Sequence, residues 1–170
     1  MAKSQINKKP ASRSGLSKTD RILDTAGWFA LASLGLLTVF TYFHVQDIIP
    51  LHFNVMGRPD RFGSKIMIFP VFAIACFIFF AITLSVKYVF NPAKAAAVPN
   101  KNFDFAIRIV RFLKLIVMIG FIYILVMTNL IADHLASGLG SFFLAAVFIS
   151  LLFPVAFFFK KTLREKLMKK

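Results

Sequence analysis

The chain is poor in several residue types, and each shortage excludes a class of protein. It has one cysteine, Cys76, so an intrachain disulfide cannot form, and we expect this residue to be small, buried and apolar in role. The G-x-S-x-G, P-loop and H-E-x-x-H motifs are all missing, which leaves hydrolase, nucleotidase and zinc-peptidase classes unsupported. There is no internal repeat either, so a transporter made of inverted repeats is not supported.

Acidic residues are scarce as well. Seven Asp and Glu stand against 21 Lys and Arg, which gives a formal net charge of +14. In a soluble protein this excess would suggest nucleic acid, but 58% of the residues are hydrophobic and the basic ones gather between apolar runs. Each basic residue near an anionic membrane surface contributes about 1 kcal/mol of attraction. We therefore expect membrane lipids as partners and no nucleic acid.

Charge is absent altogether from four runs of the chain: Thr25 to Val45, Ile66 to Val86, Leu115 to Ala132 and Ser141 to Phe159. A helix needs roughly 20 apolar residues to cross the hydrocarbon of a bilayer, and each run qualifies. We predict an all-α integral membrane protein, a four-helix bundle with spans at about 22–45, 66–88, 107–132 and 141–160. These spans form one membrane domain, residues 21–160, between a disordered basic N-terminus (1–20) and a basic tail (161–170).

Lys and Arg alternate in number along the segments that separate the runs. Six precede the first run, three lie in 46–65, six in 87–114, none in 133–140 and six after 159. Because basic residues near span ends are retained in the cytoplasm, this pattern predicts that both termini lie inside the cell and two loops outside. The expected location is the cell membrane. A homo-oligomer is left open.

The third span has an amphipathic start. Arg108 and Arg111 recur at helical spacing on one face, opposite Phe105, Ile109 and Phe112. We expect this segment to lie at the membrane headgroups, with its charged face toward solvent or lipid.

The first outer loop, expected to be ordered over 46–65, holds the densest polar content outside the spans. Its residues alternate, which predicts an extended segment with Leu51, Phe53 and Val55 on one face and His52 and Asn54 on the other. The side chains of the apolar face are expected to be buried against other parts of the protein. The loop should therefore fold onto the helix ends and leave the two polar residues lining a small pocket.

The second half of this loop, residues 57–63, has the glycine, proline and aspartate content of turns. Ser64 follows and is expected to accept a hydrogen bond from the first free amides of the second span. Ser64 with His52 could be drawn as nucleophile and base of a membrane enzyme, but capping is the preferred role. Catalysis is thus not expected, and neither is a cofactor.

The histidines cluster on one predicted side of the membrane. Imidazole and carboxylate together suit zinc or copper, so the candidate metal ligands are His44, His52, Asp133 and His134. Their spacing matches no zinc-protease or zinc-finger pattern. Imidazole also titrates near neutral pH, which suits proton sensing. A small transporter or metal-handling membrane protein is therefore the alternative function.

The first outer loop also resembles a known signature. It reads Ile49-Pro50-Leu51-His52-Phe53-Asn54, then Gly57, Pro59-Asp60-Arg61, Gly63 and Ser64-Lys65. This is similar to the I-P-x-H-F-N…G-x-x-D-x-x-G-x-K motif of SdpI-type bacterial membrane proteins, a domain of unknown function that lies between the first two spans. The chain matches the N-terminal module of such proteins, which have further spans. The resemblance implies protection from a secreted membrane-active toxin, with toxin capture coupled to sequestration of a cytoplasmic repressor.

The resemblance supplies the candidate binding residues His52, Asn54, Gly57, Asp60, Gly63 and Lys65, and the neighbouring Arg61 is added to them for its charge. The predicted function is binding of an extracellular peptide, toxin or partner protein through the first outer loop, as an immunity or signalling accessory. His52, Asn54 and Asp60 would supply polar contacts, and Arg58, Arg61 and Lys65 would attract acidic groups.

Overall fold

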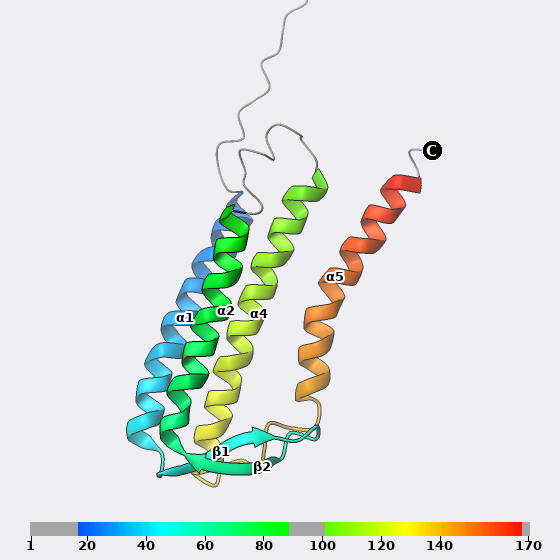
Figure 1. Ribbon diagram of the computed structural model, residues 1–170. Coiled ribbons are helices and arrows are strands. Elements are labelled where there is room, and N and C mark those ends of the chain that lie inside the picture. The colour runs from blue at the N-terminus through cyan, green and yellow to red at the C-terminus, as the bar shows by residue number, and fades with distance from the viewer. Residues whose placement is uncertain (1–16, 89–100, 168–170) are drawn as a thin grey trace, which may run out of the picture.

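The computed structural model describes residues 17–88 and 101–167. Its helices are α1 (Lys18–His44), α2 (Ile68–Tyr88), α4 (Lys101–Ala132) and α5 (Phe143–Leu167), with a short 3-10 turn η1 (Lys65–Met67) before α2. The strands β1 (Ile48–Phe53) and β2 (Pro59–Ser64) join α1 to η1. Figure 1 shows the helices side by side and the strands across one end. The expectation of disorder over 1–20 falls outside the described residues for 1–16.

Four of these segments are long and apolar enough to cross a membrane: Lys18–His44, Lys65–Tyr88, Phe105–Ala132 and Phe143–Lys160. The prediction of a mostly helical chain with four candidate spans is confirmed. Residues 18–20, expected to be disordered, instead form the first turn of α1. The cause is Ser17, whose hydroxyl accepts a hydrogen bond from the Asp20 amide at 3.2 Å and so caps the helix.

Helix α4 holds the bundle together. It packs most extensively against α1 and also contacts α2, and α5 packs mainly against α4. The shared core consists of buried apolar residues from three helices: Ala30, Leu31 and Leu34 of α1, Ala75 and Phe79 of α2, and Met118 of α4. Pro154 lies inside α5, where it removes one backbone hydrogen bond, and the helix changes direction near its middle in Figure 1.

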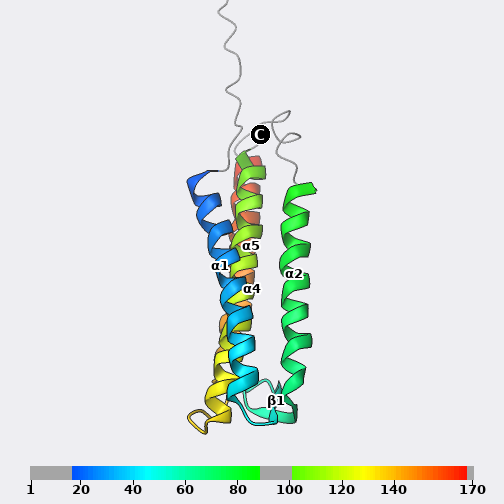
Figure 2. The ribbon, with the colours of Figure 1, turned by 90° about the vertical axis from the view of Figure 1, so that its left-hand side faces the viewer.

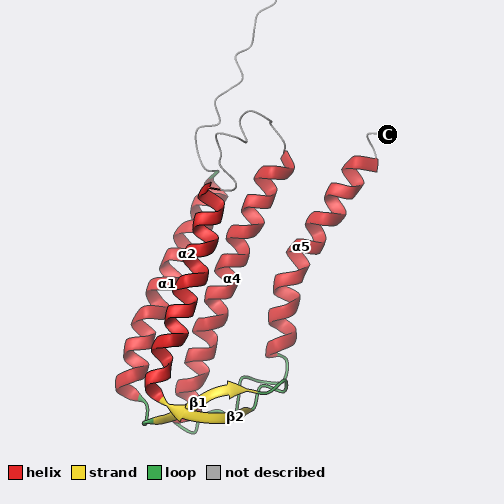
Figure 3. Cartoon of the chain, viewed as in Figure 1, coloured by secondary structure: helices red, strands yellow, loops and turns green. Residues whose placement is uncertain are grey.

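The all-α prediction is wrong in one place, because β1 and β2 form an antiparallel hairpin (Figure 3). We call residues 46–65 the cap. The bundle end that it covers is the cap end, and the opposite end, where α1 and α4 begin, is the far end (Figure 2). The hairpin turn covers residues 54–58 and lies before most of the stretch, 57–63, that was expected to form turns. That stretch mostly forms β2.

The predicted alternation of apolar and polar faces also fails within β1. Its buried residues are Ile49 and Pro50, whereas Val55 is 78% exposed. The register between the strands is irregular on both sides of His52, and such a bulge turns the following side chains away from strict alternation.

Candidate functional site

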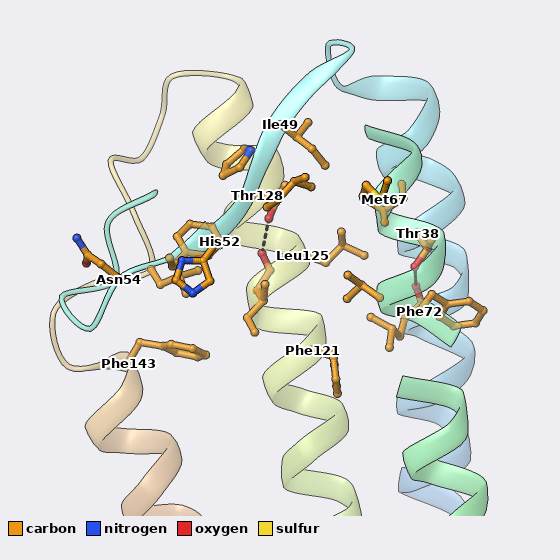
Figure 4. A pocket seen from close by; sticks show the side chains of 18 of the residues that line it. Thr38, Ile49, His52, Asn54, Met67, Phe72, Phe121, Leu125, Thr128 and Phe143 are labelled. Atoms are coloured by element: carbon orange, nitrogen blue, oxygen red, sulfur yellow. Dashed lines mark hydrogen bonds between the residues drawn. The ribbon is translucent and has the colours of Figure 1, made fainter. Parts of the chain in front are cut away.

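A cavity of about 320 Å³ lies beneath β1 at the cap end. All four helices line it: Leu34 and Thr38 of α1, Met67, Ile68, Val71 and Phe72 near the start of α2, Phe121, Ile124, Leu125 and Thr128 of α4, and Phe143 and Leu144 of α5, with Leu139 between the last two helices. Residues 49–54 close it from the cap side (Figure 4). Thr38 and Thr128 donate their hydroxyls to the carbonyls of Leu34 and Ile124. The helical walls of the cavity are therefore largely apolar.

His52 is the residue of this cavity best placed for polar recognition. Its Nδ1 lies 2.5 Å from Oδ1 of Asp60, the next strand's carboxylate. A carboxylate held at one ring nitrogen fixes the orientation of the imidazole and leaves Nε2 for another partner. The pair is exposed, at 62% and 40% of the side-chain surface. The two residues were predicted as separate ligand contacts, and the structure joins them into one unit.

Asn54 belongs to the cavity lining, as expected, but its side-chain oxygen is used in the hairpin turn. Its Oδ1 accepts hydrogen bonds from the amides of Met56 at 2.9 Å and Arg58 at 3.1 Å. In Figure 4 its amide points away from the cavity. An aspartate or asparagine that bonds the backbone two residues ahead stabilises a turn. The role of Asn54 is therefore to shape the cap.

Gly57 joins the cap to the loop between α4 and α5. Its carbonyl accepts a hydrogen bond of 2.7 Å from the Leu139 amide. It has φ of +72°, and a Cβ there would lie 2.6 Å from the carbonyl oxygen of Gly140. A Cβ at Gly138 would likewise overlap the backbone of Gly57. Only glycine satisfies both the backbone conformation and the close approach.

Two more motif residues also build the cap. Gly63 leaves the space that the Leu51 side chain fills, since a Cβ there would overlap it. Lys65 lies 3.1 Å from Asp47, donates to the carbonyl of Val45 at 3.3 Å and lies over the Tyr42 ring at 5.3 Å.

Arg61, opposite His52 in the register, is exposed. Ser64 accepts a hydrogen bond from the Ile66 amide at 3.4 Å, as predicted for a capping residue.

The four candidate metal ligands do not form a single group. His44 Nε2 lies 3.1 Å from Asp133 Oδ2, whereas His52 pairs with Asp60 on the hairpin. His134 has φ of +59° just after the end of α4, the left-handed conformation that often terminates a helix. Within residues 17–88 and 101–167, no three His, Cys, Asp or Glu side chains form a group suited to a metal ion.

A second polar cluster, which the sequence reading missed, lies at the far end. Lys114 of α4 is 1% exposed, and its ammonium donates to Asp24 of α1 at 2.8 Å and to Thr83 of α2 at 3.3 Å. The same ammonium also lies over the Phe79 ring, 4.4 Å from the ring centroid. Gly27 makes room for it, because a Cβ there would lie 3.1 Å from Cε of Lys114. Lysine has three donors, so this arrangement occupies all of them.

The neighbouring turn of the same interface holds a second ion pair. Arg111 Nη1 and Arg108 Nε each lie 3.4 Å from Oδ1 of Asp20, and Ser17 donates its hydroxyl to the same carboxylate at 2.6 Å. Arg111 is buried, which corrects the expectation that this charged face looks outward. The signal was in the spacing: Asp20 and Asp24 are four apart, and Arg108, Arg111 and Lys114 are three apart, so each set shares a helix face.

Comparison with known proteins places a family match over the cap and the two helices beside it. The family described as a domain of unknown function (DUF1648) matches residues 28–84. An uncharacterized protein of Archaeoglobus fulgidus is 40% identical over 75 residues, which are 42% of this chain and 41% of that relative's length. No solved structure matches the chain. The chain thus contains a region similar to this family, in a candidate multi-pass membrane protein.

Proposed function

We propose that the chain is a multi-pass cell-membrane protein of the SdpI type, with the cap outside the cell and both termini in the cytoplasm. The distribution of Lys and Arg supports this orientation, since 18 of the 21 lie in residues 1–24, 87–114 and 160–170 and only three in the cap. The motif of residues 49–65 supports the SdpI type, and the family match over 28–84 covers this motif.

The cap then binds an extracellular peptide, toxin or partner protein. The observation that carries this proposal is the apolar cavity of about 320 Å³ directly beneath β1. Ligand sites are typically apolar concavities with a few fixed polar groups, and His52, held by Asp60, is such a group. Apolar side chains of the ligand enter the cavity, Nε2 of His52 contacts a polar group, and Arg58 and Arg61 attract acidic residues.

Membrane orientation is tested with a single reporter cysteine. In a Cys76→Ser background, Val55→Cys places a thiol on the cap, where Val55 is 78% exposed. A membrane-impermeant maleimide should label this cysteine in intact cells. A cysteine at Leu167, 74% exposed at the end of α5, should react only after lysis. The reverse pattern would place the cap in the cytoplasm and contradict the proposed function.

The binding role is tested by survival of cells challenged with a secreted membrane-active toxin peptide. Cells making the wild type should survive, and His52→Ala or the cavity-filling Thr128→Phe should remove that protection. His44→Ala is the matched control: this histidine also pairs with an aspartate at the cap end but does not line the cavity. Equal survival with wild type and His52→Ala would refute the immunity role.

A further inference from the structure

The far end of the bundle carries a second concavity, unrelated to the cap. A groove of about 270 Å³ lies between Thr19 and Leu23 of α1 and four residues of α4, Phe105, Arg108, Ile109 and Phe112. We call it the far-end groove. The α4 residues are spaced three and four apart, so they form one continuous strip along the helix. Most of the strip is hydrocarbon, and one side chain carries a charge.

The depth of this groove along α4 matches the boundary between headgroups and hydrocarbon. Phe112 lies three residues before Leu115, where the charge-free run of this helix begins. Phe105 lies seven residues further toward the far end, about 10 Å away at the rise of an α-helix. Arg108 lies between the two, about one turn nearer the far end than Phe112, so an acyl chain that passes Phe112 and Ile109 has its polar end near Arg108.

Arg108 retains capacity for an anion. Its Nε faces Asp20 at 3.4 Å and its Nη2 donates to Ser17 at 3.2 Å, while the side chain is 39% exposed. A guanidinium has five N–H donors, and bonds to described residues use two of them. The Asp20 carboxylate is shared with Arg111, also at 3.4 Å. One negative charge thus faces two positive charges, which leaves a local excess of positive charge.

We propose that the far-end groove binds one anionic phospholipid, with an acyl chain along Ile109 and Phe112 and the phosphate on Arg108. Guanidinium matches phosphate in shape and charge. Charge complementarity favours this occupant over the chain's own segments next to the groove in sequence: residues 1–16 contain four basic residues and 89–100 one, and neither contains an acidic residue.

Native mass spectrometry of the full chain in detergent tests the proposal. Phosphatidylglycerol should bind more tightly than phosphatidylcholine with the same acyl chains. Arg108→Gln should weaken phosphatidylglycerol binding about fivefold, the factor that corresponds to about 1 kcal/mol for one basic residue near a lipid surface. Lys87→Gln, the matched control, removes one positive charge at the end of α2 outside the groove and should leave binding unchanged.

A second variant separates the groove from charge alone. Ile109→Trp keeps Arg108 and fills the groove, so it should abolish the preference for phosphatidylglycerol while circular dichroism shows intact helices. Soluble glycerol phosphate should fail to compete, because it lacks an acyl chain. The proposal is overturned if the two lipids bind wild type equally, if Lys87→Gln loses as much as Arg108→Gln, or if Ile109→Trp binds normally.

Discussion

Carboxylates pair with nitrogen-bearing side chains at both ends of the bundle, but in opposite surroundings. At the cap end, His52 and Asp60 are 62% and 40% exposed. At the far end, Lys114 is 1% exposed and 2.8 Å from Asp24. An exposed ion pair contributes about 0–1 kcal/mol to stability, whereas removing one partner of a buried pair costs about 3–5 kcal/mol. Loss of one partner alone should therefore cost most at the far end, whereas the cap groups are accessible to a ligand.

Backbone contacts, rather than charges, maintain the shape of the cap. The Asn54 side chain closes the hairpin turn, and Gly57 is bonded to Leu139 at 2.7 Å. The comparison separates two kinds of contact in one chain: buried side-chain charge between helices, and close backbone contact between loops. Substitutions at the far end should therefore disturb the packing of helices, whereas substitutions in the cap should disturb the contact between loops.

The largest expected effect comes from Asp24→Ala, which leaves the buried Lys114 ammonium with Thr83 and the Phe79 ring. The free energy of unfolding should fall by about 3 kcal/mol, measured by denaturant titration of the detergent-solubilised protein. The double variant Asp24→Ala/Lys114→Met removes both charges and should recover most of the loss.

The matched control at the cap is Asp47→Ala. Asp47 also pairs with a lysine, Lys65, at 3.1 Å, but is 93% exposed. Its loss should change stability by less than about 1 kcal/mol. If Asp47→Ala and Asp24→Ala were equally destabilising, the contrast between the two ends would be wrong.

Gly57→Ala should have an intermediate effect, because it forces a Cβ into a residue with φ of +72° and against the Gly140 carbonyl. A cost of about 1–3 kcal/mol is expected for such backbone strain. Hydrogen exchange of the Leu139 amide, which donates to Gly57, should become faster. Gly120→Ala is the control: nothing lies within 4 Å of a Cβ there, so this helical position should tolerate alanine.

The smallest effect on stability is expected for Asp60→Ala, at about 0–1 kcal/mol, because the pair is exposed. Its effect on recognition should be larger, since His52 loses the carboxylate that orients its ring. Protection from the toxin peptide should fall, while Asp133→Ala, which removes the corresponding partner of His44, should retain it. A large loss of stability with Asp60→Ala would show that the cap also depends on its charges.

The helices could be predicted from the sequence because an uncharged apolar run of sufficient length has few other structures available to it. Prediction of the cap was partial: an extended segment was expected, but the bulge at His52 and the position of the turn depend on pairing with β2. The role of Lys114 was missed because a charge at the edge of an apolar run normally marks a boundary. Its burial follows only once α1 and α4 are known to be neighbours.

The roles of the motif residues could not be derived from the sequence for a similar reason. Asn54, Gly57 and Gly63 carry the resemblance to a known signature, yet each has a structural role. Asn54 bonds the backbone of the cap, Gly57 contacts the loop between α4 and α5, and Gly63 leaves room for Leu51. Of the motif, His52 alone combines an oriented polar ring with a place in the cavity lining. A shared motif can therefore record how a loop folds more than what it binds.

The backbone contact between Gly57 and residues 138–140 has a practical consequence for protein engineering. The segment between α4 and α5 is short, uncharged apart from Asp133, and outwardly a convenient place for an epitope tag. An insertion there would separate the Leu139 amide from the hairpin and displace the start of α5 at the cap end. Tags and fusion partners belong at the chain termini, and the two loops should be redesigned together or left alone.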